Sequence, residues 1–205
     1  MSQSETARLE SFSDGVFAVA ITLLVLNLKV PGHAEITIKT NLWRLLMAQW
    51  PSFLAFFTSF ITILIIWINH HMVIKVVHQN DGNFMLINGA LLMLVTLLPF
   101  STAALAEHLG HAGERDVIIF YNGFFLVMSG VFQLLWRYAI INERLLNSEY
   151  DKKEIARINR QFKIGLLLYA ITFLLSFFLS EISLGLNIFL ALYFAGVGIF
   201  KKTPG

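Results

Sequence analysis

Residues 8–27 read RLESFSDGVFAVAITLLVLN, which joins a charged, hydroxyl-rich start to an apolar run. After Asp14, no charged residue follows until Lys29. A charge at the start of an apolar span must be paired or solvated, so Arg8 and Asp14 at this point are unusual. We therefore expect this first apolar segment to carry the function of the molecule.

The composition is that of an integral membrane protein. Of the 205 residues, 57% are hydrophobic and 14% are charged, whereas soluble domains carry about 25% charged residues. The net charge of +2 is small and the basic residues are not gathered into one patch, so we expect no nucleic-acid partner. The absence of cysteine excludes disulfides, zinc–thiolate sites and thiol catalysis.

Six apolar segments are long enough, or nearly so, to cross a membrane as helices, which takes about 20 residues each. We therefore predict an all-α integral membrane protein in which residues 1–205 form a single domain of six transmembrane helices. The predicted spans are residues 12–30, 51–74, 83–105, 117–141, 162–180 and 183–200.

The connections between the spans also carry predictions. Residues 35–49 are typical of a short amphipathic helix on the outer surface. Residues 142–160 form a charged linker that we expect to extend the neighbouring helices. Glu181 marks a very tight junction between the last two spans, which should form an antiparallel hairpin.

The basic residues predict the orientation of the chain in the membrane. With the N-terminus inside, eleven lysines and arginines lie on the inner side and four on the outer side. Inner loops of membrane proteins carry the excess of lysine and arginine. We therefore expect both termini to be cytoplasmic.

Polar side chains from several spans reach the same depth at the inner side. Because unpaired polar groups are costly where the dielectric is low, we expect Asp14 to pair with Arg8 or a histidine, and Trp67 to donate its indole N–H. Helix packing is a simpler explanation for such a network than catalysis or ion binding. The other candidates at this depth are Asn69, His70, His71, Asn83, Asn88, Gln133, Trp136 and Arg137.

The sequence offers no site for catalysis or for a resident metal. His70 and His71 are adjacent, so they point in different directions on a helix and cannot bind one ion together. No serine or lysine lies beside an evident general base, and no glycine-rich phosphate loop occurs. We therefore expect neither enzymatic activity nor a cofactor, and no metal beyond a permeating ion.

One apolar stripe runs along the first helix. At about 100° per residue, Val19, Leu23 and Leu26 lie within about 60° of one another, and Phe12 and Val30 continue the stripe. Periodicity alone is equally compatible with a stripe that faces lipid or the protein core.

A third possibility is that first helices from several subunits meet along this stripe. Gly15 and Ala18 allow helices to approach closely, and Thr22 flanks the stripe. Symmetric packing would then create an apolar constriction, and such constrictions gate by dewetting.

The residues quoted above resemble the transmembrane protein 175 family of potassium channels, in particular its short prokaryotic members. The resemblance covers the whole chain, including the six spans. The matching motifs are Arg8-x-x-x-Phe12-Ser13-Asp14, the helix end Leu-Lys-Val-Pro31, and Trp67-x-Asn69-His70 at the end of the second span.

The resemblance implies a homotetramer in a bacterial inner membrane, with the first helix of each subunit lining the pore. Potassium permeates, other monovalent cations are further candidates, and membrane lipid surrounds the tetramer. Rings of apolar side chains replace the Thr-Val-Gly-Tyr-Gly filter, a string that this chain lacks. The implied pore positions are Val19, Thr22, Leu23 and Leu26, with the hydroxyl layer contributing to potassium preference. The implied supporting network is Arg8, Phe12, Ser13, Asp14, Trp67 and His70.

Two other functions remain open from the sequence. A secondary transporter could couple to protons through Asp14 and His70, but such proteins favour inverted repeats and broken helices. The sequence shows neither clearly, although Pro99 could interrupt the third span. An enzyme or a purely structural membrane protein would show no ion flux, whereas a transporter would show saturating flux that requires a proton gradient.

Overall fold

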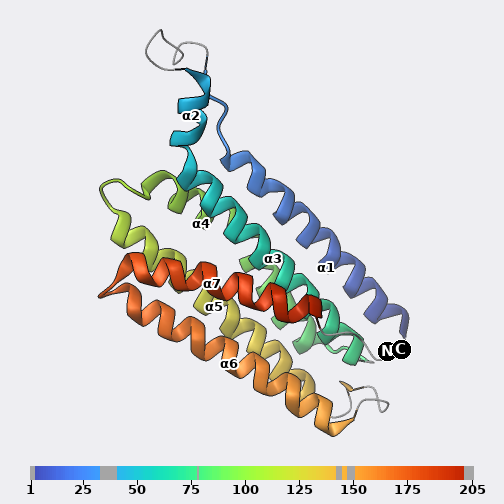
Figure 1. Ribbon diagram of the computed structural model, residues 1–205. Coiled ribbons are helices and arrows are strands. Elements are labelled where there is room, and N and C mark those ends of the chain that lie inside the picture. The colour runs from blue at the N-terminus through green and yellow to red at the C-terminus, as the bar shows by residue number, and fades with distance from the viewer. Residues whose placement is uncertain (1–2, 33–40, 78, 142–144, 147–150, 201–205) are drawn as a thin grey trace.

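The computed structural model describes residues 3–32, 41–77, 79–141, 145–146 and 151–200, with side chains from residue 6 to residue 194 within these ranges. The described residues are helical apart from short connecting segments and one isolated bridge between Val77 and Leu146. Six long helices pack side by side in a bundle (Figure 1). The predicted all-α class is confirmed.

The helices follow the chain in simple order. The first is α1 (Gln3–Leu23), which a short 3₁₀ helix η1 (Leu24–Asn27) continues. The others are α2 (Leu42–Ala48), α3 (Trp50–Val76), α4 (Gly82–His108), α5 (Glu114–Ile141), α6 (Lys152–Ser176) and α7 (Ser180–Phe200).

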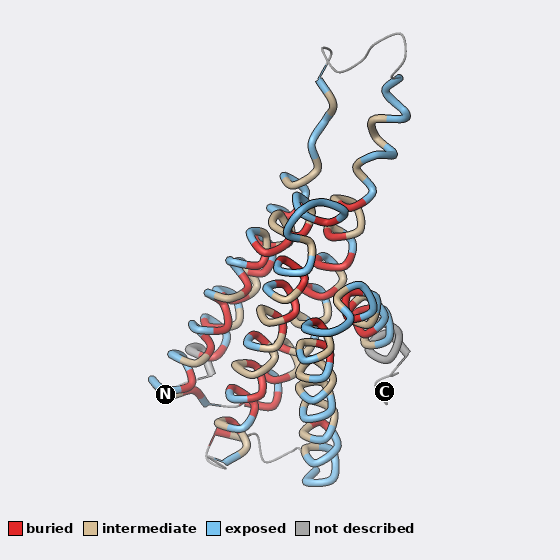
Figure 2. The backbone as a smooth tube through the Cα atoms, turned by 90° about the vertical axis from the view of Figure 1, so that its left-hand side faces the viewer, coloured by how far each residue is buried: buried red, intermediate tan, exposed pale blue. Residues whose placement is uncertain are grey.

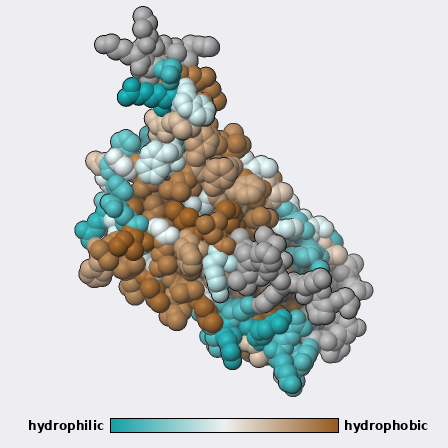
Figure 3. Space-filling view, in the orientation of Figure 1, coloured by the Kyte–Doolittle hydropathy of each residue, from teal (hydrophilic) through white to brown (hydrophobic). Residues whose placement is uncertain are grey.

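Five helical segments are long and apolar enough to cross a membrane, which agrees with an integral membrane protein. The described part of α7, Ser180–Phe194, is also apolar overall but is shorter than these five segments. Figure 3 shows hydrophobic side chains over the middle of the molecule and hydrophilic ones at the lower end, where α6 begins. The five segments are Thr6–Asn27, Trp50–Val76, Gly82–His108, Glu114–Ile141 and Lys152–Ser176.

Local sequence explains where several helices begin. Asp81 caps α4 by accepting a hydrogen bond from the Phe84 backbone N–H at 2.9 Å. Asp151 caps α6 in the same way. Pro51 occupies the first turn of α3, where its missing N–H would have no partner in any case.

The first helix differs from the predicted span at both ends. It begins at Gln3 rather than at Phe12, because the preceding residues include good helix formers and no glycine or proline. Its α-helical part ends at Leu23 instead of near Val30. The last turn tightens into η1, as helix ends do when their final carbonyls lose α-helical partners, and Leu28 is extended.

The other predicted connections are partly correct. The charged linker does extend the fifth span, since α6 begins at Lys152. The tight junction is not at Glu181, because the turn lies at residues 177–179. Glu181 lies in the first turn of α7, where its negative charge interacts favourably with the helix dipole. The amphipathic segment is helical only over α2 among its described residues. Residues 35–40, 142–144 and 147–150 of the predicted connections lie outside the described residues.

The helices are arranged with α1 and α6 on opposite sides of the bundle (Figure 1). The first helix packs against α3 and α4, whereas α6 packs mainly against α5 and α7. The predicted hairpin of the last two spans is therefore present. The remaining long helices separate α1 from α6, so the two helices meet different surroundings.

Two groups of buried polar side chains link the helices in the interior. Ser59 of α3 joins Tyr121 of α5 at 2.9 Å and accepts from the Thr102 hydroxyl of α4 at 2.7 Å. Asn122 donates to Ser183 of α7 at 3.0 Å and accepts from Asn187 at 2.8 Å. Polar pairs of this kind hold helices together in membranes, where apolar contact alone does not distinguish protein from lipid.

We predict that Tyr121→Phe weakens the bundle modestly. The change removes one interhelical hydrogen bond, which is worth about 0.5–1 kcal/mol. Thermal unfolding of the purified protein should show a small loss of stability. Tyr193→Phe on the exposed side of α7 is the matched control and should change nothing. Equal effects of the two substitutions would contradict the account.

Candidate pore helix and its supporting network

The first helix has one buried side and one exposed side (Figure 2). Phe17, Ala20 and Leu24 are buried in the core. On the other side the exposed fractions are 56% for Val19, 40% for Leu23 and 72% for Leu26; the neighbouring stripe residues Phe12 and Val30 are also exposed. The stripe residues up to Leu26 are thus largely uncovered within the described part of the chain, whereas Val30 lies beyond the helical segment and does not continue the stripe by helical spacing.

Thr22 lies on the exposed side beside this stripe. Its hydroxyl lies within hydrogen-bonding distance of the backbone carbonyls of Ala18 (3.0 Å) and Val19 (2.8 Å). Because the hydroxyl hydrogen is used inside the helix, the oxygen keeps lone pairs for another donor or for a cation. Thr22 hydroxyl oxygens from several copies of the chain would together form a ring that can contact a cation.

Asp14 does not pair with the expected Arg8 or histidine, but the expected donation by the Trp67 indole N–H is confirmed. The Trp67 indole N–H donates to Asp14 Oδ1 at 2.8 Å and joins α1 to α3. Arg8 is exposed, and no ion pair with Asp14 is seen within the described residues. Residues six apart on a helix point about 120° from one another, so Arg8 and Asp14 occupy different faces. The expected pairing of Asp14 with Arg8 or a histidine is therefore wrong.

A second set of hydrogen bonds joins α1, α4 and α3 beside the first. The Asn88 amide donates to Ser13 Oγ at 3.1 Å, and Ser13 donates to the Leu9 carbonyl at 2.8 Å. Asn88 Oδ1 lies 2.7 Å from His70 Nε2. Since Oδ1 can only accept, His70 must carry its proton on Nε2. His70, Asn88 and Ser13 are almost completely buried, so the set pins α1 against its neighbours.

Other expected members of the inner network do not join it. Phe12 lies on the exposed stripe, and Asn83 and Arg137 are exposed. Gln133 and Trp136 are buried on α5, yet their side-chain polar atoms have no hydrogen-bond partner among the described residues. These residues were grouped because they lie at the same depth in the predicted membrane. Whether they contact one another depends also on the direction in which each side chain leaves its helix.

The structure adds contacts that the sequence did not reveal. His71 Nδ1 lies 2.8 Å from Glu10 Oε1, in a close contact that is poorly aligned for a hydrogen bond. At the other end of α1, Asn27 donates to the Pro99 carbonyl at 3.2 Å. Lys29 pairs with Glu107 at 3.0 Å. The first helix is thus held at both ends. The sequence predicted that Asp14 has a partner and that Trp67 donates, but it did not predict the contacts of Glu10, Asn27 and Lys29.

The described residues contain no group of three or more histidine, aspartate or glutamate side chains arranged to hold a metal ion. His70 and His71 have separate partners, Asn88 and Glu10. The hydrogen bonds of Asp14, Asn88 and His70 Nε2 join helices, whereas His70 Nδ1 has no hydrogen-bond partner among the described residues.

Comparison with known proteins identifies a family for this arrangement. Residues 8–99 match the family described as the endosomal/lysosomal potassium channel TMEM175. A potassium channel of Chamaesiphon minutus is 48% identical over 94% of this chain and 95% of its own length. A potassium channel of Streptomyces collinus is 38% identical over 98% of this chain and 95% of its own length.

The fold also matches a solved structure. The crystal structure of a lysosomal potassium-selective channel TMEM175 homolog from Chamaesiphon minutus is similar, with a TM-score of 0.85 and 45% sequence identity. The match covers 95% of this chain and 98% of the other.

We predict that Trp67→Phe destabilises the protein by about 2 kcal/mol, because it leaves the Asp14 carboxylate without its donor. Asp14→Leu should be costly by itself, whereas the double variant should lose less than the sum of the two single losses. Chemical unfolding of all three variants measures this coupling. Trp43→Phe on the exposed side of α2 is the control. Strictly additive losses would show that the hydrogen bond does not stabilise the fold.

Proposed function

The chain belongs to the TMEM175 family, and on this premise we propose that it is a potassium channel. In this proposal four copies assemble as a homotetramer, and ions pass down the axis between their α1 helices. The relatives from Chamaesiphon minutus and Streptomyces collinus are named potassium channels and align over nearly the whole chain. The family and these relatives are ion channels, so the chain is not an enzyme.

The observation that carries the proposal is the contrast between the two faces of α1. One face is fixed by the Asp14–Trp67 and Ser13–Asn88 hydrogen bonds, while the stripe that contains Leu26 is largely uncovered by the other described residues. Gly15 has open space where a side chain would begin, so close approach of a second α1 is sterically allowed there. A helix rigidly held on one side is a suitable wall for a pore on the other.

The proposed gate consists of apolar rings rather than a carbonyl filter. Val19, Leu23 and Leu26 from four copies would narrow the axis and remove water from it, which raises the barrier to an ion. The Val19 ring would be the widest of the three for a given backbone spacing, because valine is smaller than leucine. Thr22 oxygens would lie between the rings of Val19 and Leu23 and replace part of the hydration shell of potassium.

We propose six membrane spans with both termini in the cytoplasm of a bacterial cell. The excess of eleven basic residues over four supports this orientation. The start of α1 and the end of α7 lie at the same end of the bundle (Figure 1), as an even number of spans requires. The bacterial relatives favour the inner membrane as the location.

A proton-coupled transporter is the weaker alternative. Asp14 and His70 have different hydrogen-bond partners, Trp67 and Asn88, so no direct path joins the two titratable groups. The interruption that Pro99 could have caused is absent, because α4 continues through this residue from Gly82 to His108. Transporters of this kind favour broken helices near the substrate.

We predict that Leu23→Ala and Leu26→Asn increase potassium flux several-fold and reduce the preference for potassium over sodium. Both changes weaken an apolar ring, so the axis becomes wider or wetter. Flux into liposomes that contain the purified protein measures both quantities.

The matched controls are Leu192→Ala and Leu192→Asn on α7. Leu192 is exposed on a different helix, so these variants carry similar folding costs without altering α1. They should conduct as the unchanged protein does. Unchanged flux and selectivity in Leu23→Ala of α1 and Leu26→Asn of η1 would contradict the pore assignment.

A further inference from the structure

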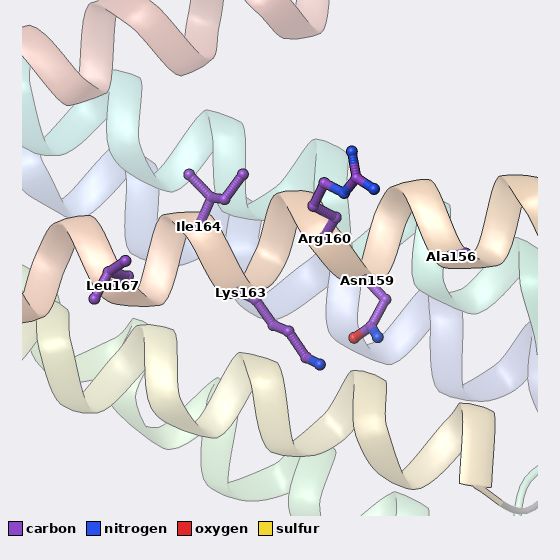
Figure 4. A pocket seen from close by; sticks show the side chains of 6 residues that line it. All are labelled: Ala156, Asn159, Arg160, Lys163, Ile164 and Leu167. Atoms are coloured by element: carbon purple, nitrogen blue, oxygen red, sulfur yellow. The ribbon is translucent and has the colours of Figure 1, made fainter.

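A shallow hollow of about 370 Å³ lies on the surface of α6. Figure 4 shows that Arg160 and Lys163 leave the helix toward opposite sides of this face. The lining residues are Ala156, Asn159, Arg160, Lys163, Ile164 and Leu167. The hollow is on the opposite side of the bundle from α1, so it is separate from the proposed pore.

The two cations of the hollow, Arg160 and Lys163, have no carboxylate partner in the part of the chain that the structure describes. Among the described residues, neither Arg160 nor Lys163 forms an ion pair, although Arg157 on the same helix pairs with Glu154 at 3.6 Å. Both side chains are exposed. Two unneutralised charges on either side of a hollow attract an anion, and a guanidinium and an ammonium are suited to phosphate oxygens.

The contacts of Phe162 define the depth of these charges. Its ring packs against Phe132 and Trp136 of α5, with centroids 5.0 and 5.4 Å apart. The uncharged run of α5 ends directly after Trp136, at Arg137. Lys163 therefore lies where the apolar layer meets the polar boundary, and Arg160 lies one turn farther out.

The same face of α6 continues as an apolar strip into the membrane layer. Ile164, Leu167, Ile171 and Leu174 are all exposed and recur at helical spacing. No charged residue follows Lys163 until Glu181. The face thus presents a cationic end at the boundary and an apolar strip below it, which is the order of a headgroup and an acyl chain.

We propose that this face of α6 binds an anionic phospholipid. The phosphate lies between Arg160 and Lys163, and one acyl chain follows Ile164 and Leu167. A zwitterionic lipid has the same phosphate, but its ammonium group repels the two cations. The recognised feature is therefore a net negative headgroup joined to an acyl chain.

The test is binding of phosphatidylglycerol to the purified full-length protein in detergent, followed by native mass spectrometry. The double variant Arg160→Gln/Lys163→Gln should weaken binding by roughly 25-fold, at about 5-fold for each charge removed. The control Lys153→Gln/Arg157→Gln removes the same charge from the same helix and should stay within about twofold of the unchanged protein. Lys163→Arg should retain binding.

Two further ligands test whether the site requires a net negative headgroup and whether it requires an acyl chain. Phosphatidylcholine and inorganic phosphate should each bind far more weakly than phosphatidylglycerol. Equal binding of phosphatidylcholine, equal binding of inorganic phosphate, or equal losses in the two double variants would each overturn the proposal. Because no ion flux is measured, the result is independent of the channel proposal.

Discussion

The hydrogen bond from the Trp67 indole to the Asp14 carboxylate is the constraint on which the position of α1 depends. A carboxylate at the start of an apolar span needs a donor, because its charge is costly where water is scarce. The neighbouring Ser13–Asn88–His70 set adds α4 to the same junction. Together these contacts orient α1, and the direction of its remaining face follows from that orientation.

The far end of α1 is fixed by different means. Asn27 reaches the backbone of α4 at Pro99, and Lys29 pairs with Glu107. Between the two anchors, the buried side chains of Phe17 and Leu24 hold this segment, and Phe17 packs on the His70 ring. In a pore formed by four such helices, each α1 would be held in place by the other helices of its own subunit. The side chains that face the axis would then not be needed to hold α1 in position.

Much of the fold was predictable from the sequence, because the signals were strong. Long apolar runs define the helices, and the charge of Asp14 predicts a hydrogen-bond donor or a cation beside it. The choice of Trp67 over Arg8 was not predictable from depth alone, since it depends on the rotation of two helices about their axes. The role of Asn88 as a bridge between Ser13 and His70 depends on the same rotation. Helix ends were missed where propensity extends a helix beyond the apolar run, as at Gln3.

The central claim is that the exposed stripe of α1 faces a conducting axis. The chain has no cysteine, so a single Leu26→Cys substitution provides one reactive thiol in an otherwise unreactive protein. Our account predicts that a cationic methanethiosulfonate reagent blocks potassium flux through this variant in liposomes, whereas a Leu192→Cys protein continues to conduct. Modification of Leu26→Cys with no loss of flux would contradict it.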